Sequence, residues 1–271
     1  MIVRDGWRAG CWVLGFVVLI LLGPPNLLLR HRPEDIGLTP DGNGAKSCTS
    51  GLAGNIVDRR WTAIDWTLSR ALGTARFWWI ALGYYFGLYV WYAVQVHQTE
   101  YLIEIGFSPA TAAWALGAVS LAAVPGQIAL GHLSDRIGRE WVWTIGNTGF
   151  VLCCVILIAL GDTPQTRLLY PMVLAQGLLG YGLTSVMGAI PAEIFEGRNF
   201  GSIFGTAMVA AILGGAVGPW VTGVLHDHFG SYLPAFSLSI GLSLISAIAI
   251  WLAAPRKVRS VAGRVRISVA D

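Results

Sequence analysis

Seven long apolar segments, none of which contains a Lys, Arg, Asp or Glu, limit most strongly what this chain can fold into. About 20 apolar residues in a helix cross the roughly 30 Å hydrocarbon core of a bilayer. Within lipid, every backbone polar group needs a partner in the chain itself, so such segments form helices. The sequence therefore predicts an all-α integral membrane protein with seven transmembrane helices, at 9–29, 77–96, 109–131, 141–161, 168–192, 199–225 and 229–254.

The composition agrees with a membrane setting and excludes several kinds of partner. Only 12% of the residues are charged, whereas soluble domains carry about 25%. A net charge of +3 cannot supply a basic face for nucleic acid. The four cysteines, Cys11, Cys48, Cys153 and Cys154, lack the spacing of metal ligands. We therefore expect the lipid bilayer as a partner, and no metal site, cofactor or nucleic acid.

The basic residues predict the orientation of the chain. If the amino terminus lies outside, only Arg4, Arg8 and Arg167 of the 18 Lys and Arg fall in outer segments. Cytoplasmic loops are enriched in Lys and Arg, so this bias predicts a cytoplasmic carboxyl terminus in a plasma membrane. Segment 9–29 could alternatively be a signal peptide, but it exceeds the usual apolar length and no small-residue cleavage site follows it.

The predicted helices divide the chain into four regions. These are a first transmembrane helix with a short outer tail (1–29), a cytoplasmic central loop (30–76), a six-helix bundle (77–254) and a basic cytoplasmic tail (255–271). Near the end of the central loop, Trp61, Ile64, Leu68 and Leu72 recur at helical spacing. This spacing predicts a helix that lies on the inner membrane surface.

One short pattern occurs twice, each time after the second helix of a three-helix set. The pattern is G-x-x-x-D-x-x-G, and its fixed positions are Gly131, Asp135 and Gly138, then Gly223, Asp227 and Gly230. Three crossings are an odd number, so the two sets insert in opposite directions. Inverted repeats of this kind are typical of secondary transporters. The last six helices are therefore predicted to form a three-plus-three inverted repeat.

The residue types of the first copy suit a tight turn at the inner membrane surface. Gly131 allows a close backbone approach, and Gly138 allows a sharp change of direction. Asp135 could accept hydrogen bonds from a helix amino terminus, while Arg136 and Arg139 would anchor the turn at the membrane surface. An ordinary charged turn is the alternative.

At these residues the sequence resembles the major facilitator superfamily, whose signature is G-x-x-x-D-R-x-G-R-[RK]. Residues 131–139 match it, whereas Glu140 replaces a basic residue, which is expected to weaken anchoring or gating. Residues 106–108 and 192–195 also look typical of the family. Within it, the sequence is most similar to the monocarboxylate and oxalate–formate branch.

The resemblance implies an alternating-access carrier for a small organic solute, not an enzyme. Segment 9–29 would correspond to the sixth helix of such a carrier, and the six-helix bundle to its seventh to twelfth helices. The first five helices have no counterpart here, so the chain looks truncated. Because two six-helix halves rock about a shared site in this family, a separate amino-terminal half is an expected partner.

The resemblance also places the solute site on the family's seventh and tenth helices. Polar side chains occur there and in segment 109–131, and the substrate-binding candidates are Tyr85, Tyr89, Tyr92, Gln95, Gln127, Gln176, Tyr181 and Thr184. The three tyrosines in 77–96 share one helical face, which could equally be a packing or interfacial face. No catalytic residue is expected.

Charge near the predicted site is scarce. Gln127 stands where the organic-anion branch commonly has an arginine, and an amide can donate to a carboxylate but cannot neutralise it. An anionic solute would therefore need a counter-charge from the other half. The spans of the six-helix bundle contain no Asp or Glu, and His97 is the nearest titratable group, with a structural role as its alternative.

Three other kinds of protein are alternatives. A heptahelical receptor would also have seven helices, but the long first inner loop and the missing N-P-x-x-Y motif oppose it. A membrane enzyme would need more than the single His97-x-x-Glu100 pair. The third alternative is a non-transporting remnant or one half of a split carrier. The G-x-x-x-G pairs Gly201/Gly205 and Gly214/Gly218 would offer packing surfaces to a second half, or would serve packing within their own half.

Overall fold

The computed structural model describes residues 2–28 and 56–261, which are helical apart from turns and one isolated bridge. They belong to two units, residues 1–53 and 54–271. Cys48, the predicted start of the central loop (30–55) and the end of the basic tail (262–271) lie outside the described residues.

The amino-terminal unit contains one long helix, α1 (Ile2–Leu28). Its stretch Arg8–Leu27 is long and apolar enough to cross a membrane. Pro24 and Pro25 lie near its end and contribute no backbone N–H. The Asn26 side-chain amide donates to the Leu22 carbonyl at 2.9 Å, which adds a hydrogen bond to this turn. The described part of the predicted segment 9–29, up to residue 28, is therefore helical.

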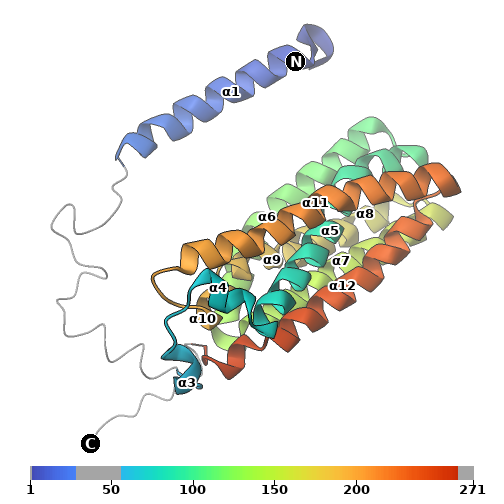
Figure 1. Cartoon of the computed structure of the whole chain (residues 1–271). Coiled ribbons are helices and arrows are strands. Elements are labelled where there is room, and N and C mark those ends of the chain that lie inside the picture. Colours follow the sequence, from blue (N-terminus) through green and yellow to red (C-terminus); the bar gives the residue numbers. More distant parts are fainter. Residues whose placement is uncertain (1, 29–55, 262–271) are drawn as a thin grey trace, which may run out of the picture. The chain divides into compact units, whose positions relative to one another are not determined.

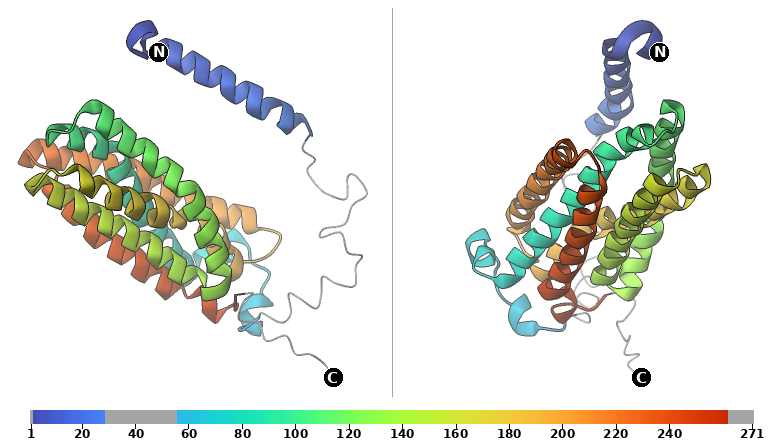
Figure 2. Two further views of the ribbon diagram at one scale, coloured as in Figure 1. Left: turned by 180° about the vertical axis from the view of Figure 1, so that it is seen from behind. Right: turned by 90° about the vertical axis from the view of Figure 1, so that its right-hand side faces the viewer.

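The second unit is a bundle of long helices that run side by side (Figures 1 and 2). Five short turns join the six described crossings of this unit, so consecutive crossings run in opposite directions. The long helices are α5 (Ala75–Glu104), α6 (Pro109–Ile137), α7 (Arg139–Asp162), α11 (Phe200–Phe229) and α12 (Leu233–Ala253). Between α7 and α11 the chain crosses once more in a segmented element, Thr166–Ile194.

Six helical stretches among the described residues have the length and composition of a membrane span, α1 included. The helix over the predicted span 77–96, α5, is not one of the six although it has 30 residues. Its length is ample for a bilayer, but its Tyr, Trp, Gln and His side chains make it less apolar. It runs along the bundle like its neighbours and is packed against α11 and α12 (Figure 1).

The helices extend beyond the predicted apolar spans because their ends are set by capping residues. Thr74 caps α5, since its side chain accepts from the Phe77 N–H. Ser108 caps α6 in the same way, and Pro109 follows as its first residue. Neither cap lies in an apolar run, so hydropathy alone could not place these ends.

Hydrogen bonds join three helices in the core. The buried Trp143 indole of α7 donates to the Ser246 hydroxyl of α12 at 3.1 Å. That hydroxyl donates in turn to the Gly83 carbonyl of α5 at 2.7 Å. The ring of Tyr84 lies 5.1 Å from the ring of Trp143. Hydrogen bonds between polar side chains and backbone groups thus connect α5, α7 and α12 within an otherwise largely apolar core.

The fourth crossing of the bundle was predicted as one helix, 168–192, and this prediction was incomplete. It consists of η3 (Thr166–Leu168), α8 (Leu169–Val173), a π-helical turn η4 (Leu174–Gly180), α9 (Gly182–Met187) and α10 (Ala189–Ile194). Pro171, Gly177, Gly180 and Pro191 interrupt or loosen regular α-helical bonding here. A π-turn inside a helix frequently marks a functional site.

The predicted surface helix over Trp61–Leu72 was wrong as a single element. Two short helices occur instead, α3 (Arg59–Thr62) and α4 (Leu68–Leu72), with caps at Asp58 and Thr67. Trp66 lies in the break and is 4% exposed, and its indole donates to the Trp61 carbonyl at 3.3 Å. The helical spacing of the apolar residues therefore does not produce one helix, because the chain leaves the helical path where Trp66 is buried.

Candidate functional site

Three of the predicted solute-binding residues form one hydrogen-bonded cluster between α5 and the segmented element. The Tyr181 hydroxyl donates to the Gln95 side-chain oxygen at 2.9 Å. The Gln176 amide donates to the same oxygen at 3.4 Å. Gln176 is fully buried, whereas Gln95 and Tyr181 are partly exposed. The cluster of Gln95, Gln176 and Tyr181 therefore extends from the interior of the bundle to its surface.

The π-turn η4 positions Gln176, and glycines allow the neighbouring helices to approach it. A Cβ at Gly149 of α7 would overlap the backbone of Ala175 and Gly180. One turn beyond Gly149, the Cys153 thiol donates to the Gln176 side-chain oxygen at 3.8 Å. The close approach of α7 thus supplies Gln176 with a second polar neighbour.

A second pair of predicted residues lies one turn further along. The Thr184 hydroxyl lies 3.0 Å from the Gln127 side-chain oxygen and 2.8 Å from the Tyr181 carbonyl, and can donate to either. A Cβ at Gly126 would overlap the Leu178 backbone, so α6 lies very close to η4 here. This close approach brings the next residue, Gln127, within reach of Thr184.

The predicted tyrosine face of α5 is turned partly toward α11. Cβ atoms at Gly214 and Gly218 would overlap the carbonyl oxygens of Tyr85 and Tyr89, respectively. The ring of Tyr92 lies against Gly215, yet 44% of this residue is exposed. Tyr85 and Tyr89 therefore lie where α5 packs on α11, Tyr85 being partly exposed, and Tyr92 is the most exposed tyrosine of this face.

Two neighbours of the cluster were missed from the sequence. The Trp91 ring lies 4.2 Å from the Tyr181 ring and 5.6 Å from the Phe150 ring. Cys153 was interpreted only as a small buried residue, and it is fully buried. The glycines of 177–182 are a signal that could have indicated close helix packing around Gln176.

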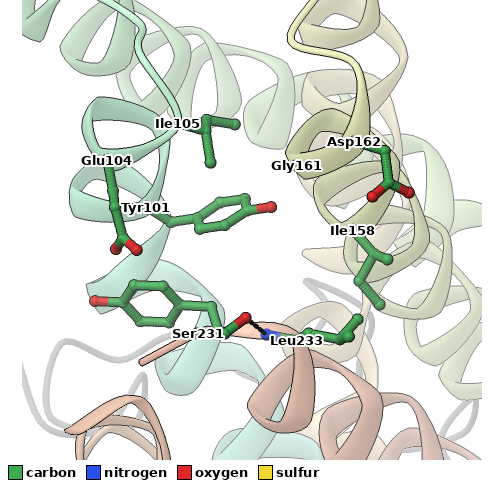
Figure 3. Close-up of a pocket in the computed structure, with 9 residues that line it drawn as sticks. Tyr101, Glu104, Ile105, Ile158, Gly161, Asp162, Ser231 and Leu233 are labelled. Atoms are coloured by element: carbon green, nitrogen blue, oxygen red, sulfur yellow. Dashed lines mark hydrogen bonds between the residues drawn. The ribbon is translucent and has the colours of Figure 1, made fainter. Parts of the chain in front are cut away.

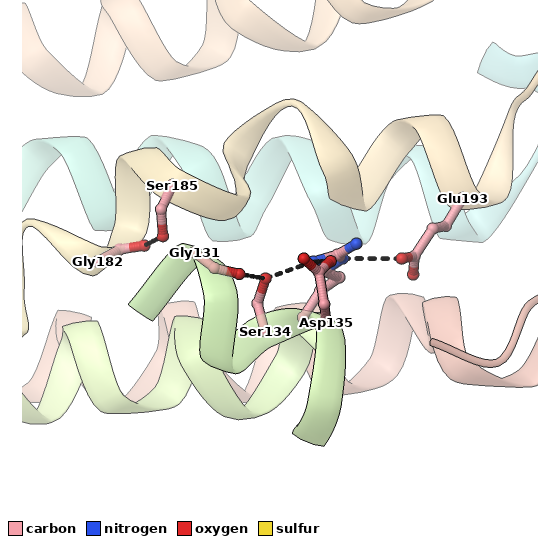
Figure 4. A network of polar contacts seen from close by, with 7 residues as sticks. Gly131, Ser134, Asp135, Gly182, Ser185 and Glu193 are labelled. Atoms are coloured by element: carbon pink, nitrogen blue, oxygen red, sulfur yellow. Dashed lines mark hydrogen bonds and ion pairs between the residues drawn. The ribbon is translucent and has the colours of Figure 1, made fainter. Parts of the chain in front are cut away.

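The signature residues form a compact ionic network at the end of α6. The Arg139 guanidinium lies 2.7 Å from Asp135, an i,i+4 pair, and donates through Nε to Glu193 of α10 at 2.8 Å. It also donates to the Ser134 hydroxyl, which donates in turn to the Gly131 carbonyl at 2.6 Å (Figure 4). Arg139 thus links α6 and α7 to α10.

This network bears on two expectations. Only 16% of the Arg139 side chain is exposed and it pairs with Glu193, so its role at the membrane surface stays a prediction. The carboxylate of Asp135 pairs with Arg139 and not with a helix amino terminus. Arg136, in contrast, is exposed. The predicted loop shrinks to Gly138, because α6 ends at Ile137 and α7 begins at Arg139.

The two copies of the repeated pattern end alike in one respect. Gly138 has φ = 114° and Gly230 has φ = 64°, and each follows the last residue of a long helix. Both values lie in the region that favours glycine. The inverted repeat itself remains a prediction.

A polar cavity of about 310 Å³ lies at the opposite end of the bundle, where α5 and α7 end. Tyr101 and Asp162 project toward it from opposite walls, with Glu104 nearby (Figure 3). The Tyr101 hydroxyl donates to the Leu157 carbonyl at 2.8 Å. His226 of α11 lies 3.2 Å from Glu104. No group of three His, Cys, Asp or Glu in the described ranges could hold a metal ion.

His97, the titratable group predicted nearest the site, lies between helices near this cavity. Its Nε2 lies 3.0 Å from the Pro219 carbonyl oxygen, and its Nδ1 lies 3.4 Å from the Tyr232 hydroxyl. Both ring nitrogens thus contact groups of neighbouring elements. The geometry favours the structural role of this histidine.

A bundle of membrane-length helices with a polar cluster inside it, and a charged turn at one end, defines a membrane protein of the transporter class. The family model of the Major Facilitator Superfamily matches residues 91–266. The chain belongs to this superfamily. The predicted branch within it is not confirmed.

The chain is also similar to individual transporters. It is 24% identical to the glycerol-3-phosphate transporter of Haemophilus influenzae, over 84% of this chain and 51% of that protein. It is 25% identical to the 3-(3-hydroxy-phenyl)propionate transporter of Escherichia coli, over 93% of this chain and 57% of that protein. A triacylglyceride transporter of Mycobacteroides abscessus is 29% identical over 46% of this chain and 24% of that protein. The chain spans about half the length of the first two relatives.

Proposed function

We propose that the chain supplies a six-helix half of an alternating-access carrier that moves a small organic solute across a membrane. The solute contacts the cluster of Gln95, Gln176 and Tyr181 and the neighbouring pair Gln127 and Thr184. The observation that carries this proposal is that the Gln95 side-chain oxygen accepts hydrogen bonds from both Tyr181 and Gln176. Polar side chains are costly to bury among apolar membrane helices, so a cluster of them indicates a functional site.

The same side chains keep hydrogen-bonding capacity for a solute. The Gln127 side-chain oxygen accepts from Thr184, whereas its amide nitrogen takes no part in that bond and can donate to a solute. Thr184 and Tyr92 are exposed, and Gln95 and Tyr181 are partly exposed. A solute that enters from this face would meet amide and hydroxyl groups first and the buried Gln176 last.

The class of solute follows from these groups and from the relatives. Amides and hydroxyls bind hydroxyl, carbonyl or carboxylate groups of a small organic solute. For an organic anion, the neutralising charge would come from a second, amino-terminal half, as Gln127 cannot provide it. The relatives named for glycerol 3-phosphate and for 3-(3-hydroxy-phenyl)propionate supply two solutes to test.

Uptake into proteoliposomes tests this function. The chain would be reconstituted alone and together with a separately expressed amino-terminal half of a related carrier, with each labelled solute supplied outside. We expect uptake only with both halves, and we expect Gln95→Ala and Gln176→Ala to reduce it about five- to thirtyfold, because each removes a bond worth about 1–2 kcal/mol.

Gln165→Ala is the matched control, because its amide pairs with Arg167 outside the cluster. Uptake that is unchanged in both cluster variants would refute the proposed site. Uptake by monomers of the chain alone would instead refute the need for a second half.

The charges support a plasma-membrane orientation with a cytoplasmic carboxyl terminus. Arg70, Arg76, Arg136, Arg198 and Arg256 lie at the end of the bundle where α5 begins. At the other end, Arg167 is accompanied by Glu100, Glu104, Asp162 and Asp227. The positive-inside rule therefore favours the α5 start as the cytoplasmic end.

The proposal of a half-carrier also requires a surface on which a second half can pack. Leu121 and Ile128 of α6, and Ile212 and Trp220 of α11, are more than 60% exposed in the bundle. Gly201 and Gly205 of α11 have no atom within 4 Å of an added Cβ, whereas Gly214 and Gly218 pack on α5. The first G-x-x-x-G pair thus remains open for another bundle, while the second serves packing within this one. We accordingly propose a transport role for the chain and no enzymatic one.

A further inference from the structure

The chain segment that follows α12, residues 254–261, lies across the end of the bundle that carries the signature network. Ala254 ends α12 in a left-handed conformation with φ = 51°, and a short turn, η5 (Pro255–Lys257), follows. Val258 and Arg259 are buried although they lie beyond the last helix. Arginine is rarely buried unless it is paired, so the burial of Arg259 indicates that this segment makes specific contacts with the bundle.

The first contact ties the tail to the start of α7. Glu140 is 2% exposed, and its carboxylate accepts the Arg256 backbone N–H at 3.0 Å. The Arg256 guanidinium lies 4.0 Å from the same oxygen and 4.4 Å from the centre of the Trp251 ring. Glu140 is the residue that departs from the family signature. A lysine or arginine there could not accept this N–H.

The second contact ties the tail to the turn between α10 and α11. The Arg259 side chain, 10% exposed, forms an ion pair with Glu196. Glu196 follows Glu193 by three residues, and Glu193 holds Arg139. Arg139 immediately precedes Glu140 in the chain. The ionic contacts therefore close a ring that runs through α7, the tail and the α10–α11 turn.

The third contact ties the tail to the end of the central loop. The Val258 carbonyl accepts the N–H groups of Val57 and Asp58, at 2.9 and 3.2 Å, and Ile56 bridges Arg259. From there the loop docks on the α10–α11 turn, since the Trp61 indole donates to the Ile194 carbonyl at 2.8 Å. The Asn199 amide donates to the Trp66 carbonyl at 3.2 Å.

We propose that residues 254–261 are a clasp that holds the α7 start, the α10–α11 turn and residues 56–66 together as one rigid unit. Glu140, Glu196 and Arg259 are its positioning residues. If the chain is part of a carrier, as proposed above, opening of this end of the bundle during transport requires release of the clasp. The clasp itself is a property of the described chain and can be tested without any solute.

Hydrogen exchange measured by mass spectrometry on the full chain in lipid nanodiscs tests the clasp. Arg259→Gln and Glu196→Gln each remove the ion pair, and we expect exchange in 56–66 and 193–200 to accelerate about fivefold. Exchange in the middle of α5 should stay unchanged, which shows that the bundle still folds. The exchanged pair, Glu196→Arg with Arg259→Glu, should restore the original protection.

Arg198→Gln is the matched control, because Arg198 is an exposed arginine in the same turn and pairs with no described residue. Single variants that leave the protection of 56–66 unchanged would overturn the clasp. So would an exchanged pair that fails to restore it. Transport activity does not enter these readouts, so a failure of the carrier proposal is distinguishable from a failure of the clasp.

A second pair of variants tests Glu140. Glu140→Gln keeps a carbonyl oxygen that can accept the Arg256 N–H, whereas Glu140→Lys offers only donors. We expect Glu140→Gln to retain protection of 255–261 and Glu140→Lys to lose it about tenfold, because a lysine would also face Arg256. Equal protection in the two variants would refute the role of the acceptor oxygen.

Discussion

Gly138, Arg139 and Glu140 follow one another in the chain and contact different parts of the bundle. Gly138 alone separates α6 from α7. Arg139 binds Asp135 and Glu193, and Glu140 accepts the Arg256 N–H. Arg139 and Glu140 are the first two residues of α7, and successive side chains of an α-helix point about 100° apart, so the two face different neighbours. Because Gly138 places the start of α7 directly after the end of α6, both the signature network and the anchor of the tail depend on its backbone conformation.

Gly138→Ala tests this dependence. The backbone there has φ = 114° and ψ = 155°, a region that is essentially restricted to glycine. We expect the alanine variant to lose about 1–3 kcal/mol in the free energy of unfolding, measured by denaturant titration in detergent micelles. Gly117→Ala, a helical glycine of α6 with open space around it, is the control and should be neutral or slightly stabilising. Equal unfolding free energies for the two variants would contradict this account.

At the scale of elements, α11 has two different glycine surfaces on one helix. Gly214 and Gly218 bring α11 against the backbone of α5, while Gly201 and Gly205 are open. Because lipid tails are as apolar as the helices, close backbone approach and the packing it allows are what hold α5 and α11 together. The close approach also determines which part of the α5 tyrosine face remains accessible.

Alanine substitutions along α11 should separate the two surfaces. An added methyl at Gly214 or Gly218 would overlap a carbonyl oxygen of α5, and we expect each variant to lose about 1–3 kcal/mol of stability. Gly201→Ala and Gly205→Ala should leave stability almost unchanged. Thermal unfolding in detergent, followed by tryptophan fluorescence, measures all four. If the Gly201 and Gly205 variants were the less stable ones, the packing of α11 described above would be wrong.

At the scale of the whole bundle, the two ends differ in charge. Basic residues dominate the end with the signature network and the clasp, and carboxylates dominate the end with the polar cavity. Lys and Arg are retained on the cytoplasmic side during insertion, so this asymmetry supports the proposed orientation, in which the end where α5 begins is cytoplasmic.

Cysteine labelling in intact cells tests that direction. In a variant with the native cysteines replaced by alanine, Asp227→Cys should react with a membrane-impermeant maleimide from outside, since 86% of the Asp227 side chain is exposed. Arg198→Cys, at the opposite end of the bundle, should react only after the membrane is permeabilised. The reverse pattern would contradict the predicted orientation.

Much of the fold could be predicted because membrane helices are governed by local composition. Long apolar segments indicate the helices, and Gly138 indicates the sharp turn, because both follow from the chemistry of single segments or residues. The π-turn at Leu174–Gly180 and the break at Trp66 could not be predicted in this way. They depend on close contacts with α6 and α7, and on burial under residues far away in sequence.

The sequence by itself determined that the chain is a helical membrane protein with a family signature at 131–139, since hydropathy and a fixed motif are read along the chain. Only the tertiary structure decided which of the predicted polar residues meet. It joins Gln95, Gln176 and Tyr181, turns Tyr85 and Tyr89 toward α11, and directs Glu140 to the tail. The physical reason is that each of these contacts depends on how closely two helices approach, and that distance is set by glycines on the partner helix and not by the polar residue itself.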